Sequence, residues 1–204
     1  MILALRRLFL TLFVSIVIAS QVEASPPGPK DWSLAPGVEL LRSALSFSEA
    51  GAGQGQELAS GLSFSLRLIS GTNLAETFSV SLDLRQSFAR SDGRRDLGLL
   101  ATRLGVRGDW LLSETWWFGA TWYFGDTVVV RHHDRQYNGT STAFSLSMRG
   151  AGAAVWFLQF TFGSYQEGPG FIALSRRPGD DGLHLRSLGV GVEFPFQPAS
   201  WGGS

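Results

Sequence analysis

The amino-acid sequence predicts an all-β protein made of eight antiparallel strands. Large apolar residues occupy every second position in long stretches, as in residues 62–70 (LSFSLRLIS) and 77–88 (TFSVSLDLRQSF). Successive side chains of a β-strand leave opposite faces, so this alternation indicates strands with one apolar face. The residues between them are mostly Ser, Gly, Ala and Thr, with isolated Arg, Asp or Glu. Small residues of this kind suit a cramped interior better than an open surface.

The first 24 residues are predicted to be a secretory signal peptide. They carry Arg6 and Arg7, then an apolar run from Leu8 to Ala19 and a small-residue cleavage site at 22–24. The run is well short of the roughly 20 apolar residues that a membrane-spanning helix needs, so we expect cleavage and export. A Pro-rich lead-in, residues 25–37, comes next, and a tail, residues 197–204, follows the last predicted strand.

The composition excludes several kinds of site. The 204-residue chain has 17 basic and 17 acidic residues, and removing residues 1–24 with Arg6, Arg7 and Glu23 leaves 15 and 16. This balance gives no sign of nucleic-acid binding. Cysteine is absent, so disulfides and thiolate metal sites are excluded. The single lysine after the leader is Lys30, whereas soluble β-proteins usually place Lys on solvent faces and edge strands.

The eight predicted strands lie within residues 38–196. Their approximate ranges are 38–47, 57–69, 76–89, 97–111, 116–130, 141–149, 154–165 and 183–196. The connections after odd-numbered strands are longer and mostly charged, whereas those after even-numbered strands are short and nearly uncharged. Barrels of the bacterial outer membrane alternate in this way, with short periplasmic turns and longer external loops. The predicted fold is therefore a closed, up-and-down transmembrane β-barrel whose apolar faces contact lipid.

Aromatic residues gather at the strand ends that meet the short turns and at the end of the last strand. The residues concerned are Trp110, Trp116, Trp117, Trp156, Phe157, Phe194 and Phe196. We expect them to form a girdle at the periplasmic interface, where amphipathic rings lie at headgroup level. The alternative for each single ring is a place in the core.

The last predicted strand supports the prediction of an outer-membrane barrel. It ends in residues 191–196 (GVEFPF), which resemble the C-terminal signal of bacterial outer-membrane proteins, a Gly followed by aromatic residues on one strand face. That signal usually ends the chain, whereas here residues 197–204 follow. Together with the strand count, the chain resembles the small eight-stranded outer-membrane barrels, the class of the OmpA transmembrane domain, OmpX and PagP. This resemblance of architecture implies a monomeric barrel in the bacterial outer membrane, in contact with lipid and lipopolysaccharide.

Charged residues on the predicted inner faces are expected to form ion pairs. They are Arg42, Arg67, Asp83, Arg85, Arg103, Arg107, Asp109, Arg149 and Glu193. Pairing of the third and fourth strands about Gly93 would set Asp83 opposite Arg103, and closure of the barrel would bring Arg42 to Glu193. Burial of an unpaired charge is costly, so pairing is expected. The interior of an eight-stranded barrel is only wide enough for side chains, which favours a packed network over the alternative, a narrow channel with a basic bias.

The predicted external rim holds the residues that suggest chemistry. His132, His133, Asp134, Ser141 and His184 are all expected there. PagP and PagL, small barrels that transfer or remove an acyl chain of lipid A, use His and Ser near the outer leaflet, so a lipid A-modifying enzyme is an alternative function. The sequence lacks the His-x-Ser arrangement associated with PagL, and spacing alone carries little specificity. A zinc site from His132, Asp134 and His184 ranks lower still.

The expected function is therefore non-enzymatic. External loops would contact lipopolysaccharide, a surface partner or another envelope component, and Arg94, Arg95, Arg131 and Arg135 lie where they would meet anionic headgroups. No cofactor and no metal are expected. A soluble, lipocalin-like barrel is the opposite reading of the same alternation, with Leu and Phe inside and Ser and Arg in water.

Overall fold

The computed structural model describes residues 33–49, 52–69, 77–93, 98–131, 135–150, 154–168 and 182–196. Its strands are β1 (Ser33–Glu49), β2 (Ala52–Ile69), β3 (Phe78–Ser91), β4 (Gly98–Leu111), β5 (Trp116–Val130), β6 (Arg135–Arg149), β7 (Val155–Glu167) and β8 (Gly182–Glu193). The predicted signal peptide, residues 25–32 of the lead-in and the tail lie outside the described residues. Residues 33–37, also predicted as lead-in, belong to β1, because their backbone pairs with β2 from Ser33 onward. Within the described residues, no helix has the length and apolar character needed to cross a membrane.

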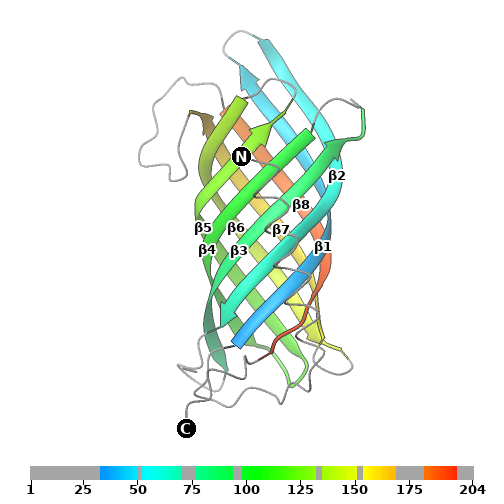
Figure 1. The fold of residues 1–204 in the computed structure, drawn as a ribbon, viewed down its shortest axis with the longest axis vertical. Coiled ribbons are helices and arrows are strands. Elements are labelled where there is room, and N and C mark those ends of the chain that lie inside the picture. Colours follow the sequence, from blue (N-terminus) through cyan, green and yellow to red (C-terminus); the bar gives the residue numbers. More distant parts are fainter. Residues whose placement is uncertain are drawn as a thin grey trace.

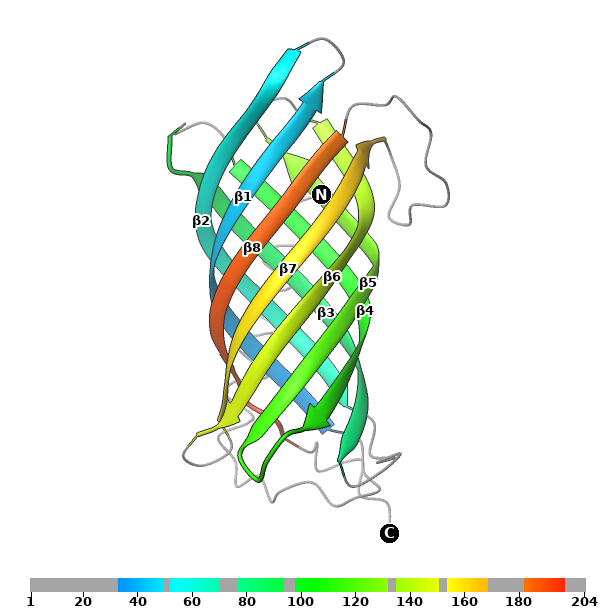
Figure 2. The same cartoon turned by 180° about the vertical axis from the view of Figure 1, so that it is seen from behind.

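The strands form one closed barrel. Each strand pairs antiparallel with the next along the chain, and β8 pairs with β1. The closing ladder runs from Gly37 opposite Glu193 to Ser48 opposite Gly182. Figures 1 and 2 show the tilted strands winding around a common axis. Closure pairs the strand edges that an open sheet would leave exposed in hydrocarbon, and it confirms the predicted fold.

The two ends of the barrel differ. The end where β1 begins and β8 ends also holds the connections β2–β3, β4–β5 and β6–β7, and we call it the terminal end. At the opposite end β1 and β2 extend beyond their neighbours (Figures 1 and 2). The predicted strand ranges leave residues 48–56 as the first connection, but β1 and β2 continue through most of it, and Phe47 pairs with Gly55 and Glu49 with Ala52. β6 likewise begins at Arg135 rather than at the predicted 141.

The apolar face of the strands points outward. Exposed residues of this face include Leu40, Leu62, Leu82, Val106, Trp122, Phe144, Phe160, Leu188 and Val190. The alternating Ser63, Ser65 and Ser81 are buried. Each exposed Leu or Phe forgoes about 1.5–3 kcal/mol of burial in water, so a belt of them requires an apolar solvent. The arrangement is that of a transmembrane barrel and the reverse of a soluble, lipocalin-like one.

A β-bulge in β5 changes which side chains face inward. The register with β6 shifts between Tyr123 and Asp126. Before the shift, odd-numbered residues such as Thr121 and Tyr123 are buried, and after it Asp126 and Val128 are buried instead. An extra residue in one strand reverses the alternation beyond it. The bulge therefore turns a carboxylate into the barrel that a regular strand would have directed toward lipid.

The interior is filled in two zones. A network of charged side chains occupies the half nearer the terminal end. The opposite end holds a cluster of buried apolar and aromatic side chains: Leu45, Ala59, Leu99, Ala101, Val128, Val130, Tyr137, Tyr165, Leu183 and Leu185. This cluster is a packed core, as the small diameter of an eight-stranded barrel requires.

Candidate functional site

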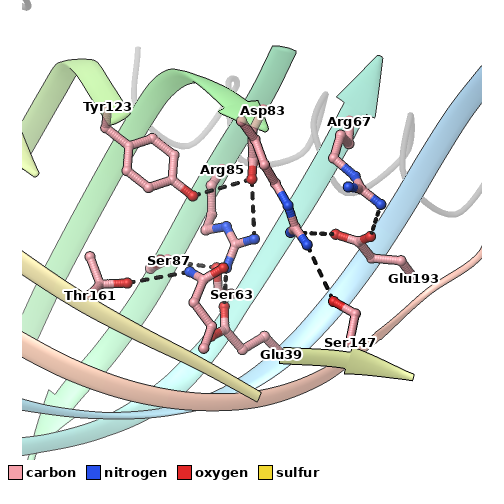
Figure 3. A network of polar contacts seen from close by, with 12 residues as sticks. Glu39, Ser63, Arg67, Asp83, Arg85, Ser87, Tyr123, Ser147, Thr161 and Glu193 are labelled. Carbon is pink, nitrogen blue, oxygen red and sulfur yellow. Dashed lines mark hydrogen bonds and ion pairs between the residues drawn. The ribbon is translucent and has the colours of Figure 1, made fainter. Parts of the chain in front are cut away.

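Arg67 and Arg107 form the part of the ion network nearest the terminal end. The Arg67 guanidinium donates one hydrogen bond to Asp109 Oδ2 and one to Glu193 Oε2, each 2.6 Å long. Arg107 donates from Nε to Asp109 Oδ1 at 2.8 Å and from a terminal nitrogen to Ser147 Oγ at 3.2 Å. Figure 3 shows Arg67, Glu193 and Ser147 converging from different strands. The pairs link β2, β4, β6 and β8 through the centre of the barrel.

Arg85 forms the middle of the network. It donates to Glu39 Oε2 at 2.6 Å and to Asp83 Oδ2 at 3.3 Å, and Tyr123 donates its hydroxyl to the same Asp83 oxygen at 3.2 Å (Figure 3). The guanidinium also lies over the ring of Phe157, 5.7 Å from its centroid. Two terminal nitrogens and a cation–π contact thus stabilise the buried guanidinium, whereas Arg85 Nε is buried without a hydrogen bond.

Asp126 forms the part of the network nearest the apolar cluster. Its Oδ2 accepts hydrogen bonds from Arg103 Nε at 3.1 Å, from the Tyr165 hydroxyl at 2.7 Å and from the Ser141 hydroxyl. Arg103 lies over the Tyr123 ring at 6.0 Å. Three donors from β4, β6 and β7 thus converge on one oxygen of the buried carboxylate on β5, whereas its Oδ1 is buried without a hydrogen bond.

The composition of the network differs from the predicted one. Of the predicted set, the structure buries Arg67, Asp83, Arg85, Arg103, Arg107, Asp109 and Glu193. Arg42 is on the outer face, with a side chain 66% exposed, and Arg149 is exposed at the mouth of the terminal end. The sequence analysis missed Glu39 and Asp126, both buried. Among the described residues, five buried carboxylates thus face four buried guanidiniums, so the predicted basic bias of the interior is wrong.

Both predicted pairings across the barrel wall are also wrong. Asp83 lies opposite Gly105, and Arg103 lies opposite Arg85, because the β3–β4 register is centred one residue beyond Gly93. Arg103 therefore pairs with Asp126 from the next strand. At the seam, Arg42 lies opposite Leu188 and points outward, and Glu193 binds Arg67 instead.

The predicted catalytic residues do not assemble within the described part of the chain. Ser141 is buried inside the barrel on Asp126, whereas His184 is exposed on the outer face. The wall of the barrel separates them, because Ser141 and Leu185 both face inward beside Gly163 and His184 precedes Leu185. His132, His133 and Asp134 lie outside the described residues. Among the residues that are described, no three His, Asp or Glu side chains group to hold a metal ion.

The predicted aromatic girdle divides between two faces. Trp110, Trp116 and Trp156 are exposed on the outer surface near the terminal end, as expected of a girdle, and Phe194 is half-buried there. Neighbours in a strand face opposite sides, so Phe157 points inward beneath Arg85 and Trp117 lines the mouth of the interior. Phe196 is buried where its backbone bridges Leu34.

Three arginines cross the outer face where the apolar belt ends toward the opposite end of the barrel. We call Arg186, Arg42 and Arg90, on β8, β1 and β3, the arginine row. All three are exposed. Arg186 on β8 lies opposite Ala44, and is therefore diagonal to Arg42 on β1. On the other side, Ser60 on β2 lies between Arg42 and Arg90, opposite both. Diagonal neighbours on adjacent strands, such as Arg42 and Arg186, are about 7–8 Å apart, whereas Arg42 and Arg90 are separated by the whole width of β2.

One carboxylate accompanies the arginine row. Asp92 Oδ2 lies 3.6 Å from an Arg42 terminal nitrogen and accepts a hydrogen bond of 3.3 Å from Ser60 Oγ. The Asp92 side chain is 43% exposed. Leu40 and Leu188 beside the row belong to the apolar belt. The row thus places guanidinium groups next to exposed apolar side chains of the outer face.

Comparison with known proteins finds similar solved structures but no family. No protein-family model and no curated protein matches the chain. Among solved structures, it is similar to Neisserial surface protein A (10% identity, 78% of this chain and 97% of that one, TM-score 0.47). It is also similar to Ail, the attachment invasion locus protein of Yersinia pestis, in complex with the heparin analogue sucrose octasulfate (8% identity, 81% and 99%, TM-score 0.48). A further match is the outer membrane protein OprG from Pseudomonas aeruginosa (9% identity, 84% and 98%, TM-score 0.41).

Proposed function

We propose that the protein is a non-enzymatic barrel of the bacterial outer membrane that binds the phosphate groups of lipopolysaccharide on its outer wall. In this placement the terminal end faces the periplasm and the arginine row lies at the headgroup level of the outer leaflet. The observation that carries the proposal is the arginine row itself, three exposed guanidiniums at the upper edge of the apolar belt.

The chemistry of the row fits phosphate. A guanidinium presents two parallel N–H groups that match two phosphate oxygens, and these charge-assisted bonds are among the strongest in proteins. Arg186 makes no ion pair within the described residues, so its guanidinium is available to an anionic headgroup, whereas Arg42 lies 3.6 Å from Asp92. An arginine facing pure hydrocarbon at mid-membrane would cost several kcal/mol, whereas at the interface the cost falls to about 0–1 kcal/mol.

The row also refines the expectation drawn from the sequence, which assigned lipid contact to the external loops. Arg94 and Arg95 lie outside the described residues, and Arg135 pairs with Glu167 at 3.5 Å. The proposal therefore rests on the barrel wall. A lipid A-modifying activity gains no support from the described residues, because Ser141 and His184 lie on opposite faces.

The test uses protein purified in detergent and immobilised for surface plasmon resonance with lipopolysaccharide. Replacing Arg42, Arg90 and Arg186 together by Gln should weaken binding at least tenfold, and dephosphorylated lipopolysaccharide should bind wild-type protein as weakly. Arg149→Gln is the matched control, because Arg149 is exposed at the other end of the barrel. Equal binding by the triple variant and the wild type would disprove the proposal.

A further inference from the structure

The interior opens into a cavity at the terminal end. It has a volume of about 280 Å³, and we call it the vestibule. Its polar wall includes Arg67, Arg107, Asp109, Ser147 and Arg149, so the terminal part of the ion network forms its floor. Ile69, Phe78, Leu111 and Val155 contribute apolar surface to the same cavity. A concave space with an apolar wall and a few convergent polar groups is the usual form of a small-molecule site.

Two buried guanidinium N–H groups in the vestibule wall have no acceptor. Arg67 Nε and one terminal nitrogen of Arg107 are buried without a hydrogen bond. That Arg107 nitrogen is 3.8 Å from Glu193 Oε1, beyond hydrogen-bond distance. Both nitrogens are enclosed by protein atoms and do not face the cavity, so they are unsatisfied donors behind its floor and not donors that a ligand can reach.

Arg149 is the cation of the vestibule that no carboxylate neutralises. Its guanidinium lies over the Trp117 ring, 5.7 Å from the centroid, and it makes no ion pair within the described chain. The cation–π contact holds the Arg149 guanidinium near the indole without using its N–H groups, which remain available to an oxyanion. The stacking also reduces the conformational freedom that Arg149 would lose on binding.

The local charge selects the kind of anion. Arg67 and Arg107 pair with Asp109 and Glu193, and Arg149 lines the same cavity, so the described residues leave a net charge of +1 at this end of the interior. A monoanion balances that charge, whereas a dianionic phosphate would be repelled by the two carboxylates. The apolar wall adds favourable contact for an organic substituent. A cavity of this size holds a small ligand only.

We propose that the vestibule binds a small organic carboxylate from the periplasmic side, with Arg149 as the residue that first engages the carboxylate group. This site is distinct from the arginine row in position and in ligand. It would make the barrel a two-sided binding protein, with lipid phosphate on the outer wall and a soluble carboxylate inside the terminal end.

Isothermal titration of the purified protein in detergent tests the proposal with three probes: N-acetyl-Ala-Ala with a free carboxylate, the same dipeptide as its amide, and inorganic phosphate. The free carboxylate should bind, and the amide should bind at least tenfold more weakly. Arg149→Gln should weaken carboxylate binding at least fivefold, Arg149→Lys less, and Arg42→Gln, on the outer wall, should not change it.

The remaining outcomes overturn the proposal. Absence of carboxylate binding to the wild type would do so, as would equal binding of the amide or of Arg149→Gln. Stronger binding of phosphate than of the dipeptide would reject an organic carboxylate as the ligand. Because the arginine row plays no part in these titrations, their failure leaves the proposal of lipopolysaccharide binding untouched.

Discussion

Arg67 and Glu193 join the two sides of the barrel seam through its interior. They lie on β2 and β8, with β1 between them, and the Arg67 guanidinium donates to Glu193 Oε2 at 2.6 Å although 126 residues separate the two in sequence. Both side chains are almost fully buried. The ion pair therefore connects the last strand to the first hairpin independently of the backbone ladder that closes the sheet.

Replacing Arg67 by Met should destabilise the barrel by about 3–5 kcal/mol, because it leaves a buried carboxylate without its partner. Arg42→Met is the matched control, since it removes an arginine from an exposed ion pair with Asp92 and should change stability by less than about 1 kcal/mol. Urea unfolding in phospholipid vesicles without lipopolysaccharide measures both. Equal stabilities of the two variants would show that the buried network contributes nothing beyond packing.

Gly119 provides space for the network on β5. A Cβ added there would lie 2.6 Å from Asp109 Oδ1 and 2.8 Å from an Arg107 terminal nitrogen. Gly119→Ala should therefore destabilise the protein by about 1–3 kcal/mol, the usual cost of overfilling a packed interior. Gly93→Ala is the control, because a Cβ at Gly93 meets nothing within 4 Å. The same urea titration compares them, and an unchanged midpoint for Gly119→Ala would contradict the packing described here.

Much of this fold could be predicted because alternate residues of each strand in a membrane barrel face lipid and the interior. In β2, each Ser or Arg between Leu62 and Leu68 faces inward, so a single phase describes the strand. In β1 the consecutive apolar residues Leu40 and Leu41 are compatible with either the even-numbered or the odd-numbered residues facing inward. The prediction that places Arg42 inside is wrong. That error also hid Glu39, which shares the inward face with Leu41.

Other features depend on information that alternation does not contain. Asp126 faces inward only because the bulge after Tyr123 reverses which residues of β5 face the interior. The residue types of that segment give no sequence signal for the extra position. The predicted Asp83–Arg103 pair is wrong because it assumes a β3–β4 hairpin centred one residue too early. A shift of one residue in the centre displaces every cross-strand partner by two. Arg90 and Arg186 could have been predicted to face outward. Each lies two residues from an apolar residue of the outer face, Phe88 or Leu188, and side chains two apart in a strand share a face.

The interior should not conduct ions. The apolar cluster that contains Leu45, Val128 and Leu183 fills the barrel at the end opposite the vestibule, and each of these side chains is fully buried. A hydrophobic constriction excludes hydrated ions even where a polar vestibule leads to it. Purified protein in planar bilayers is expected to give no stepwise current above that of a protein-free membrane, with a wide porin as the positive control. Regular single-channel steps would restore the narrow-channel alternative.

Ser141 is expected to act in stability and not in catalysis. Its hydroxyl is one of three donors to the buried Asp126 Oδ2, so Ser141→Ala should cost about 1–3 kcal/mol by leaving that carboxylate less compensated. Ser113→Ala, in the exposed β4–β5 turn, should leave stability unchanged. Urea unfolding gives the first readout, and mass spectrometry of lipid A from cells expressing each variant gives the second. A lipid A acylation pattern that depends on Ser141 but not on Ser113 would contradict the interior role, because a hydroxyl enclosed by Asp126 and Tyr165 inside the barrel has no path to an acyl chain outside it.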